Sequence, residues 1–131
     1  MTLTMESFKK LGLSEEIIKA LAEAKFEKPT EIQEKAIPLT LEGKDVIGGA
    51  MTGSGKTLAF GASIIQNLPR RHGVQALIMT PTRELAEQVG KSLRAFSKHK
   101  PLNIVMVYGG IGIGPQIRAL ETADVVVGTP G

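Results

Sequence analysis

The sequence GGAMTGSGKT, residues 48–57, decides the fold because of what flanks it. The preceding DVIGG, Asp45–Gly49, predicts a short buried strand, and the residues from Gly55 to about Gln66 predict a helix. A glycine-rich turn between a strand and a helix is the setting of a phosphate-binding loop. The alternative is a Gly/Ser turn that only caps the helix.

The chemistry of this loop favours a nucleoside triphosphate. Gly53 and Gly55 allow the backbone to turn its N–H groups inward, where they and the N-terminus of the helix suit a polyphosphate. Lys56 would reach the β- and γ-phosphates, and the Thr57 hydroxyl would bind Mg²⁺. Ala50 stands where the first glycine of such loops is usual, but the glycines nearest the phosphates are intact. The loop alone says little about the base.

Downstream of the loop, expected strands and helices alternate. The strands are QALIMT, NIVMVY and DVVVGT, at Gln75–Thr80, Asn103–Tyr108 and Asp124–Thr129. One helix is expected from Pro115 to about Glu121, and another runs from Thr82 to about His99 with an apolar side formed by Leu85, Ala86, Val89, Leu93 and Phe96. Continuous apolar strands separated by helices predict an α/β fold, with a parallel sheet flanked by helices.

Upstream, residues 1–43 predict a helical N-terminal region. Ser14 is a candidate N-cap for a helix to about Ala24, and a second helix begins at Thr30 and ends near Leu41. We therefore expect a helical part, 1–43, and an α/β part, 44–131. The last residues follow a strand directly, where a further helix is normal, so we expect the α/β part to be truncated after TPG, Thr129–Gly131.

Composition narrows the class of protein. The 131 residues carry a net charge of +3 and contain no cysteine, which excludes disulfides and thiolate metal sites. The mildly basic balance is compatible with a polyanionic partner, but on charge alone an ordinary soluble surface is the favoured explanation. No apolar run approaches the ~18 residues that span a membrane, and the N-terminus lacks the apolar core of a signal peptide. We expect a cytoplasmic protein with no membrane partner.

The segment FEKPTEIQ, Phe26–Gln33, has two interpretations. Thr30 and Gln33 have the spacing of a capping box, in which each side chain bonds the backbone N–H of the other residue. Local physics favours this box. However, a glutamine amide also offers a donor and an acceptor side by side, which match the N6/N7 edge of adenine.

Several features, taken in order along the chain, resemble the DEAD-box RNA helicases. They are Phe8, the Gln33 segment, the phosphate loop, PTREL at Pro81–Leu85, the pair Gly109-Gly110, and TPG at Thr129–Gly131. PTREL or TPG alone is weak evidence, but the whole series is specific and covers essentially the whole chain. The resemblance implies the first of two RecA-like domains in an ATP-dependent RNA helicase, with ATP and Mg²⁺ as cofactors and RNA as partner.

The resemblance also implies which residues bind the nucleotide. Phe8 would stack on the adenine that Gln33 reads, although Phe8 is alternatively a core aromatic. Ala50 is ordinary at the start of this family's loop, whereas Lys25 departs from its usual glycine. Lys56 and Thr57 would be catalytic, and Thr57 would hold Mg²⁺ through the nucleotide. The implied cofactor-binding residues are Phe8, Phe26, Lys28, Thr30, Gln33, Ala50, Met51, Thr52, Gly53, Ser54, Gly55, Lys56 and Thr57.

The resemblance implies a second set of residues that contact RNA. They are Pro81, Thr82, Arg83, Glu84, Gly109, Gly110, Thr129, Pro130 and Gly131. All follow expected strands, on the carboxyl edge where open α/β sheets bind ligands. Arg83 is alternatively a surface cation or a partner of Glu84 or Glu87, and the glycine pair is alternatively a simple turn. Because aromatic residues make up only 4% of the chain, we expect sequence-independent contact with the RNA backbone.

The 131 residues contain no DEAD tetrapeptide and no second domain of the helicase type. Hydrolysis needs an aligned water and stabilised transition-state charge, so we predict that this chain alone does not turn over ATP appreciably. We also expect self-association or marginal stability, because an incomplete sheet exposes an edge. Two other functions stay open: a different phosphate-loop enzyme, such as a DNA translocase or small-molecule kinase, and a non-catalytic nucleotide-binding module.

Overall fold

The computed structural model describes residues 2–51, 55–69 and 73–131, and side chains from Met5 onward. The chain forms two compact units. The first consists of Met1–Leu68 and Ala95–Lys100, and the second consists of Pro69–Arg94 and Pro101–Gly131. No helix in the described ranges is long and apolar enough to cross a membrane.

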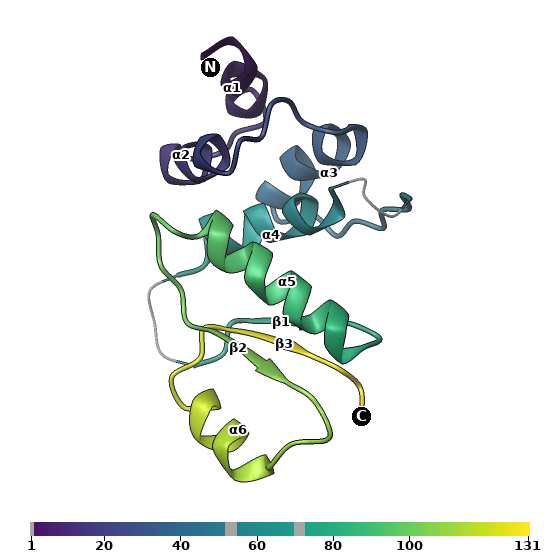
Figure 1. The fold of residues 1–131 in the computed structure, drawn as a ribbon. Coiled ribbons are helices and arrows are strands. Elements are labelled where there is room, and N and C mark those ends of the chain that lie inside the picture. Colours follow the sequence, from purple (N-terminus) through teal and green to yellow (C-terminus); the bar gives the residue numbers. More distant parts are fainter. Residues whose placement is uncertain (1, 52–54, 70–72) are drawn as a thin grey trace. The chain divides into compact units, whose positions relative to one another are not determined.

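The first unit is helical. Its helices are α1 (Thr2–Lys9), α2 (Glu15–Glu23), α3 (Glu31–Leu41) and α4 (Lys56–Asn67) (Figure 1). Helices α3 and α4 pack on each other. Apolar residues at helical spacing form the core because burying one face of each helix is the main stabilising term. The largest fully buried apolar side chains are Phe8, Ile17, Leu21, Ile37, Leu58 and Ile65.

Polar contacts fix the beginning of α2 to the end of α4. The Gln66 side chain accepts a hydrogen bond from the Ser14 N–H at 2.8 Å and donates one to the Gly12 carbonyl at 2.9 Å. Ser14 precedes α2 as expected, but its side chain does not cap the helix, and its buried hydroxyl has no hydrogen-bond partner among the described residues. The expected side-chain cap is therefore absent, and Gln66 bonds the Ser14 backbone instead.

The second unit contains a parallel sheet, which confirms the α/β fold. Its strands are β1 (Ala76–Met79), β2 (Ile104–Val107) and β3 (Val125–Gly128), in the order β1-β3-β2. Val125, Val126 and Val127 of the central strand are all buried. A strand covered on both faces requires such a continuous apolar run.

The sheet of this unit lies between α5 (Arg83–Phe96) and α6 (Ile113–Leu120) (Figure 1). Gly90 lets α5 approach β2, since a Cβ there would stand 2.6 Å from the Met106 sulfur. Helix α5 ends at Phe96, three residues before the predicted His99, and continues as turns. Of the residues on its predicted apolar side, Ala86, Val89, Leu93 and Phe96 are buried, whereas Leu85 is 40% exposed.

The predicted strand at Asp45–Gly49 is wrong. This segment has no regular structure and pairs with no described strand. Ile47 is fully exposed and Val46 is 38% exposed. A strand needs a hydrogen-bonding neighbour, and no described strand lies against this apolar segment.

Candidate nucleotide and nucleic-acid sites

The described part of the phosphate loop ends in a left-handed glycine. Gly55 has φ 85° and ψ 25° and is the N-cap of α4, which begins at Lys56. Glycine adopts this conformation without the steric cost that other residues bear. Thr52, Gly53 and Ser54, which were also predicted to bind phosphate, lie outside the described residues.

The Lys56 side chain points back to Ala50, at the start of the loop. Its Nζ donates a hydrogen bond to the Ala50 carbonyl oxygen at 2.8 Å, and its side chain is exposed. The ammonium therefore lies at the start of the loop, bonded to an oxygen that a phosphate oxygen could replace. Thr57 is half-buried in the first turn of α4, and Met51 is 83% exposed. The described residues contain no cluster of His, Asp and Glu side chains that could hold a metal by itself.

Gln33 joins the two segments that were predicted to bind the nucleotide. Its side chain is only 2% exposed. Its Oε1 accepts a hydrogen bond from the Thr30 N–H at 2.9 Å, and its Nε2 donates one to the Gly55 carbonyl oxygen at 3.1 Å. The capping-box interpretation is therefore confirmed for the Gln33 side, and the same amide also holds the phosphate loop.

The packing around the Gln33 amide leaves room only for a glycine at position 55. A Cβ at Gly55 would stand 2.3 Å from Gln33 Nε2 and 3.1 Å from Thr30 Oγ1. That Thr30 oxygen is buried and has no hydrogen-bond partner among the described residues, although it occupies its place in the box. The N-terminus of α3, which the Thr30–Gln33 turn forms, is consequently in direct contact with the N-terminus of α4.

Of the two aromatic residues predicted near the base, Phe8 belongs to the core and Phe26 is half-buried. Phe8 is fully buried, and its ring meets Phe26 edge to face with centroids 6.3 Å apart. Phe26 in turn meets Phe96 at 5.6 Å. This is the alternative arrangement expected for Phe8, and stacking on adenine stays a prediction. Lys28 is exposed.

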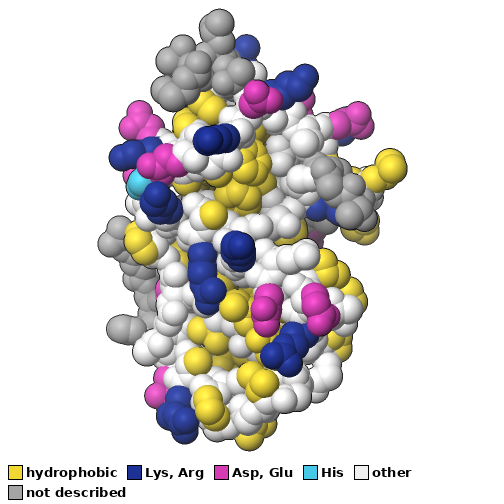
Figure 2. Space-filling view, viewed as in Figure 1, with side chains coloured by type: hydrophobic (Ala, Val, Ile, Leu, Met, Phe, Trp, Pro, Cys, Tyr) yellow, Lys and Arg dark blue, Asp and Glu magenta, His cyan; other side chains and the backbone are white. Residues whose placement is uncertain are grey.

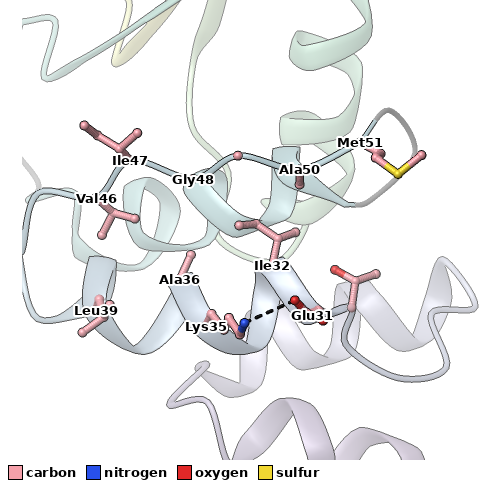
Figure 3. Close-up of a pocket in the computed structure, with 12 residues that line it drawn as sticks. Glu31, Ile32, Lys35, Ala36, Leu39, Val46, Ile47, Gly48, Ala50 and Met51 are labelled. Atoms are coloured by element: carbon pink, nitrogen blue, oxygen red, sulfur yellow. Dashed lines mark hydrogen bonds and ion pairs between the residues drawn. The ribbon is translucent and has the colours of Figure 1, made fainter.

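An apolar hollow lies beside the start of the loop (Figure 3). Its volume is about 600 Å³, and it lies between α3 and the irregular segment that leads to the loop. Its charged lining residues, Glu31 and Lys35, pair with each other at 3.2 Å. Because most of its other lining residues are apolar, the hollow does not suit a polyphosphate. Its apolar lining residues are Ile32, Ala36, Leu39, Val46, Ile47, Ala50 and Met51.

The second unit brings the predicted RNA-binding segments to one edge of the sheet. The last residues of the strands lie level, because Met79 and Val107 both pair with Gly128. Since all three strands are parallel, the segments that follow them leave the same edge. The expected convergence at the carboxyl edge is therefore confirmed for PTREL, Gly109-Gly110 and TPG.

Short hydrogen bonds order these segments. The Thr80 hydroxyl donates to the Thr82 carbonyl at 3.1 Å, and Thr82 Oγ1 accepts from the Leu85 N–H at 3.2 Å, which caps α5. In the central segment the Thr129 N–H donates to the Val107 carbonyl at 3.1 Å. The exposed members of the predicted set are Pro81, Thr82, Arg83, Glu84, Gly109, Gly110, Pro130 and Gly131.

Arg83 lies in a cluster of three side chains. Its Cζ stands 4.7 Å from the centroid of the Tyr108 ring, and its Nε lies 3.7 Å from Glu87 Oε1. The Tyr108 hydroxyl donates to the same carboxylate oxygen at 2.9 Å. The expected alternative partner Glu87 is therefore present. Over the N-terminal part of α5, acidic side chains accordingly lie beside basic ones (Figure 2).

Sequence reasoning missed Gln116, which organises the glycine-rich turn after β2. Gln116 is 9% exposed. Its Oε1 accepts from the Tyr108 N–H at 2.9 Å, and its Nε2 donates to the Gly112 carbonyl at 3.1 Å. The signal was a glutamine at the position where α6 is buried, because a buried amide needs hydrogen-bond partners.

Comparison with known proteins gives consistent relatives. The family described as DEAD/DEAH box helicase matches residues 30–131. The chain is 50% identical over 129 residues to the ATP-dependent RNA helicase CshA of Listeria monocytogenes, an alignment that covers 97% of this chain and 25% of CshA.

Solved structures agree with this relationship. A DEAD box protein from the hyperthermophile Methanococcus jannaschii superposes with a TM-score of 0.91 at 46% identity, over 95% of this chain and 35% of that one. Dbp5 of S. cerevisiae, bound to RNA and ADP BeF3, gives 0.84 at 34% identity, over 95% and 32%. The chain thus spans a quarter to about a third of the length of these relatives.

Proposed function

The chain belongs to the DEAD/DEAH box helicase family, and from this premise we propose that it binds ATP with Mg²⁺ through its first unit and single-stranded RNA through its second. In a protein of the relatives' length, these two events would drive ATP-dependent remodelling of RNA. CshA is an ATP-dependent RNA helicase, and Dbp5 binds RNA together with a nucleotide analogue.

The observation that carries the ATP proposal is the hydrogen bond from Gln33 to Gly55. It connects the amide that suits the adenine edge to the glycine that is the N-cap of the phosphate-loop helix. Lys56 would exchange the Ala50 carbonyl for the β- and γ-phosphates, which are the stronger acceptors. Thr57, at the second position of α4, would then offer its hydroxyl to Mg²⁺ beside those phosphates.

A titration with fluorescent ATP tests this proposal. Lys56→Ala removes a charge-assisted hydrogen bond and should weaken binding about ten- to a hundredfold. Lys44→Ala is the matched control, since Lys44 is an exposed lysine of the same unit that pairs with Glu42. Equal weakening by both changes would contradict a phosphate role for Lys56. Equal competition by GTP and ATP would contradict the adenine assignment and favour a different phosphate-loop protein.

The RNA proposal draws on the three segments at the carboxyl edge. They offer exposed backbone, the Arg83 guanidinium and the start of α5, all of which suit phosphates rather than base edges. Anisotropy of labelled oligo(U) and oligo(A) should therefore give similar affinities. Arg83→Ala should weaken both, whereas Arg118→Ala, an exposed arginine on α6, serves as the control. Strong preference for one base would contradict backbone recognition.

Hydrolysis is a separate step. We expect no RNA-stimulated phosphate release from this chain, because the sequence contains no DEAD tetrapeptide to position Mg²⁺ and water. A phosphate-release assay measures this directly, with the Lys56→Ala chain as background. Release above that background would contradict the expectation.

Self-association is part of the proposal. Ile47 of the first unit and Leu77 and Met79 of β1 are largely exposed apolar side chains. Such surface favours contact between copies. Size-exclusion chromatography with light scattering should show a mass that rises with concentration, and a constant monomer mass would contradict this.

A further inference from the structure

Arg83 is the cation of the proposed RNA edge, and long exposed side chains of this type are normally mobile. Its guanidinium instead has two fixed neighbours, the Tyr108 ring on one side and Glu87 beside its Nε. Its terminal Nη atoms make no hydrogen bond within the described ranges. A guanidinium held in this way keeps its terminal donors available for a phosphate.

Tyr108 is itself firmly placed. Its N–H is bonded to buried Gln116, and its hydroxyl is bonded to Glu87. The next two residues are the glycine pair, and a Cβ built at Gly110 would stand 4.0 Å from an Nη atom of Arg83. Tyr108 thus joins the glycine turn after β2 to the arginine at the start of α5.

We propose that Tyr108 is a positioning residue that holds the Arg83 guanidinium at the carboxyl edge of the sheet, ready for a phosphate of single-stranded RNA. The inference rests on the proposed RNA function and adds a residue to it. The aromatic face attracts the cation, and the hydroxyl keeps Glu87 beside the guanidinium Nε. Tyr108 acts through Arg83 and does not stack on a base.

The test is a double-mutant cycle on the whole chain, with oligo(U) anisotropy measured over a range of salt concentrations. Tyr108→Leu should weaken binding about two- to fivefold, because the cation–π contact is lost. Tyr108→Phe keeps the ring face and should retain most of the affinity. In an Arg83→Ala background, Tyr108→Leu should have no further effect.

The salt dependence distinguishes positioning from general damage. Arg83→Ala should reduce the slope of log K against log salt by about 0.7, the value for one lost phosphate contact on a single strand. Tyr108→Leu should move the slope toward that of Arg83→Ala. Circular dichroism and thermal melting of each variant control for folding.

A second readout needs no RNA. The ring current of Tyr108 should displace the Arg83 Nε–H NMR resonance, and this displacement should disappear in Tyr108→Leu and persist in Tyr108→Phe. If Arg83→Ala weakens RNA binding but Tyr108→Leu does not, the positioning role is wrong and the RNA function stands. If Tyr108→Leu weakens binding equally without Arg83, Tyr108 contacts RNA itself and the proposal is overturned. If the unaltered chain binds no RNA, the proposed function fails first, and the inference falls with it.

Discussion

The segment before the phosphate loop and the central strand of the sheet have similar sequences but different structures. DVIGG at Asp45–Gly49 has no regular structure, whereas DVVVGT contains β3, which pairs on both sides. Val127 is fully buried, and Ile47 is fully exposed. The difference teaches that an apolar run becomes a strand only where neighbours satisfy its backbone and cover its side chains.

The largest expected effect comes from the loop that follows the irregular segment. Gly55→Ala places a Cβ 2.3 Å from Gln33 Nε2 in a left-handed residue, and it should lower the free energy of unfolding by about 3 kcal/mol. Gly43→Ala is the matched control, because Gly43 has the same φ of 85° and nothing near its Cβ position. It should cost only about 1–2 kcal/mol. Urea denaturation measures both, and equal losses would show that the Gln33 contact is unimportant.

The comparison of the two apolar segments can be tested directly. Val127→Ala removes buried volume from β3 and should lower the free energy of unfolding by about 2 kcal/mol. Val46→Ala, at a side chain that is 38% exposed, should change it by less than about 0.5 kcal/mol. A large loss at Val46 in urea denaturation would mean that Asp45–Gly49 is buried in solution, for instance between copies.

A smaller effect is expected at the glycine-rich turn of the second unit. Gln116→Leu leaves the Tyr108 N–H and the Gly112 carbonyl without their partner, and it should cost about 1–2 kcal/mol. Gln88→Leu on the exposed side of α5 is the control, with a change within about 0.5 kcal/mol. Hydrogen exchange at the Tyr108 amide should also rise in Gln116→Leu, and an unchanged rate would argue against this anchor.

The smallest expected effect on stability comes from the His99–Glu23 pair of the first unit. The hydrogen bond from His99 at 2.5 Å, with help from Lys98 and Lys19, lowers the pKa of Glu23 below its ordinary value of 4.5. Because the folded state holds this pKa down, the stabilisation is present above pH 4.5 and is lost as the pH falls through the lowered pKa.

The change Glu23→Gln should therefore reduce stability slightly at pH 7 and not at pH 3. Glu16→Gln, on the same helix, is the control. A stability difference for Glu23→Gln that is the same at both pH values would contradict an electrostatic origin.

Local pattern predicted most of the fold because helices and buried strands follow from periodicity along the chain. The three strands of the sheet and helices α2 to α6 lie within a few residues of their expected positions. The left-handed Gly55 and the Thr30–Gln33 turn also follow from local rules.

The errors arose where distant neighbours decide the outcome. Asp45–Gly49 lacks a partner strand among the described residues. The Ser14 side chain forms no cap, and the Ser14 N–H instead donates to Gln66, 52 residues away. The Gln33 contact with Gly55 and the Tyr108 contact with Arg83 likewise join segments that no local pattern relates.

Both ends of the Gln33 amide form hydrogen bonds within the protein. Its oxygen accepts from the Thr30 N–H, and its nitrogen donates to the Gly55 carbonyl. One N–H and one oxygen lone pair of the amide remain beyond these two bonds, so a base could bind the same amide without displacing the protein's own groups. The first turn of α3 and the N-cap of the phosphate-loop helix share this one amide, so both would respond to whether the site holds adenine.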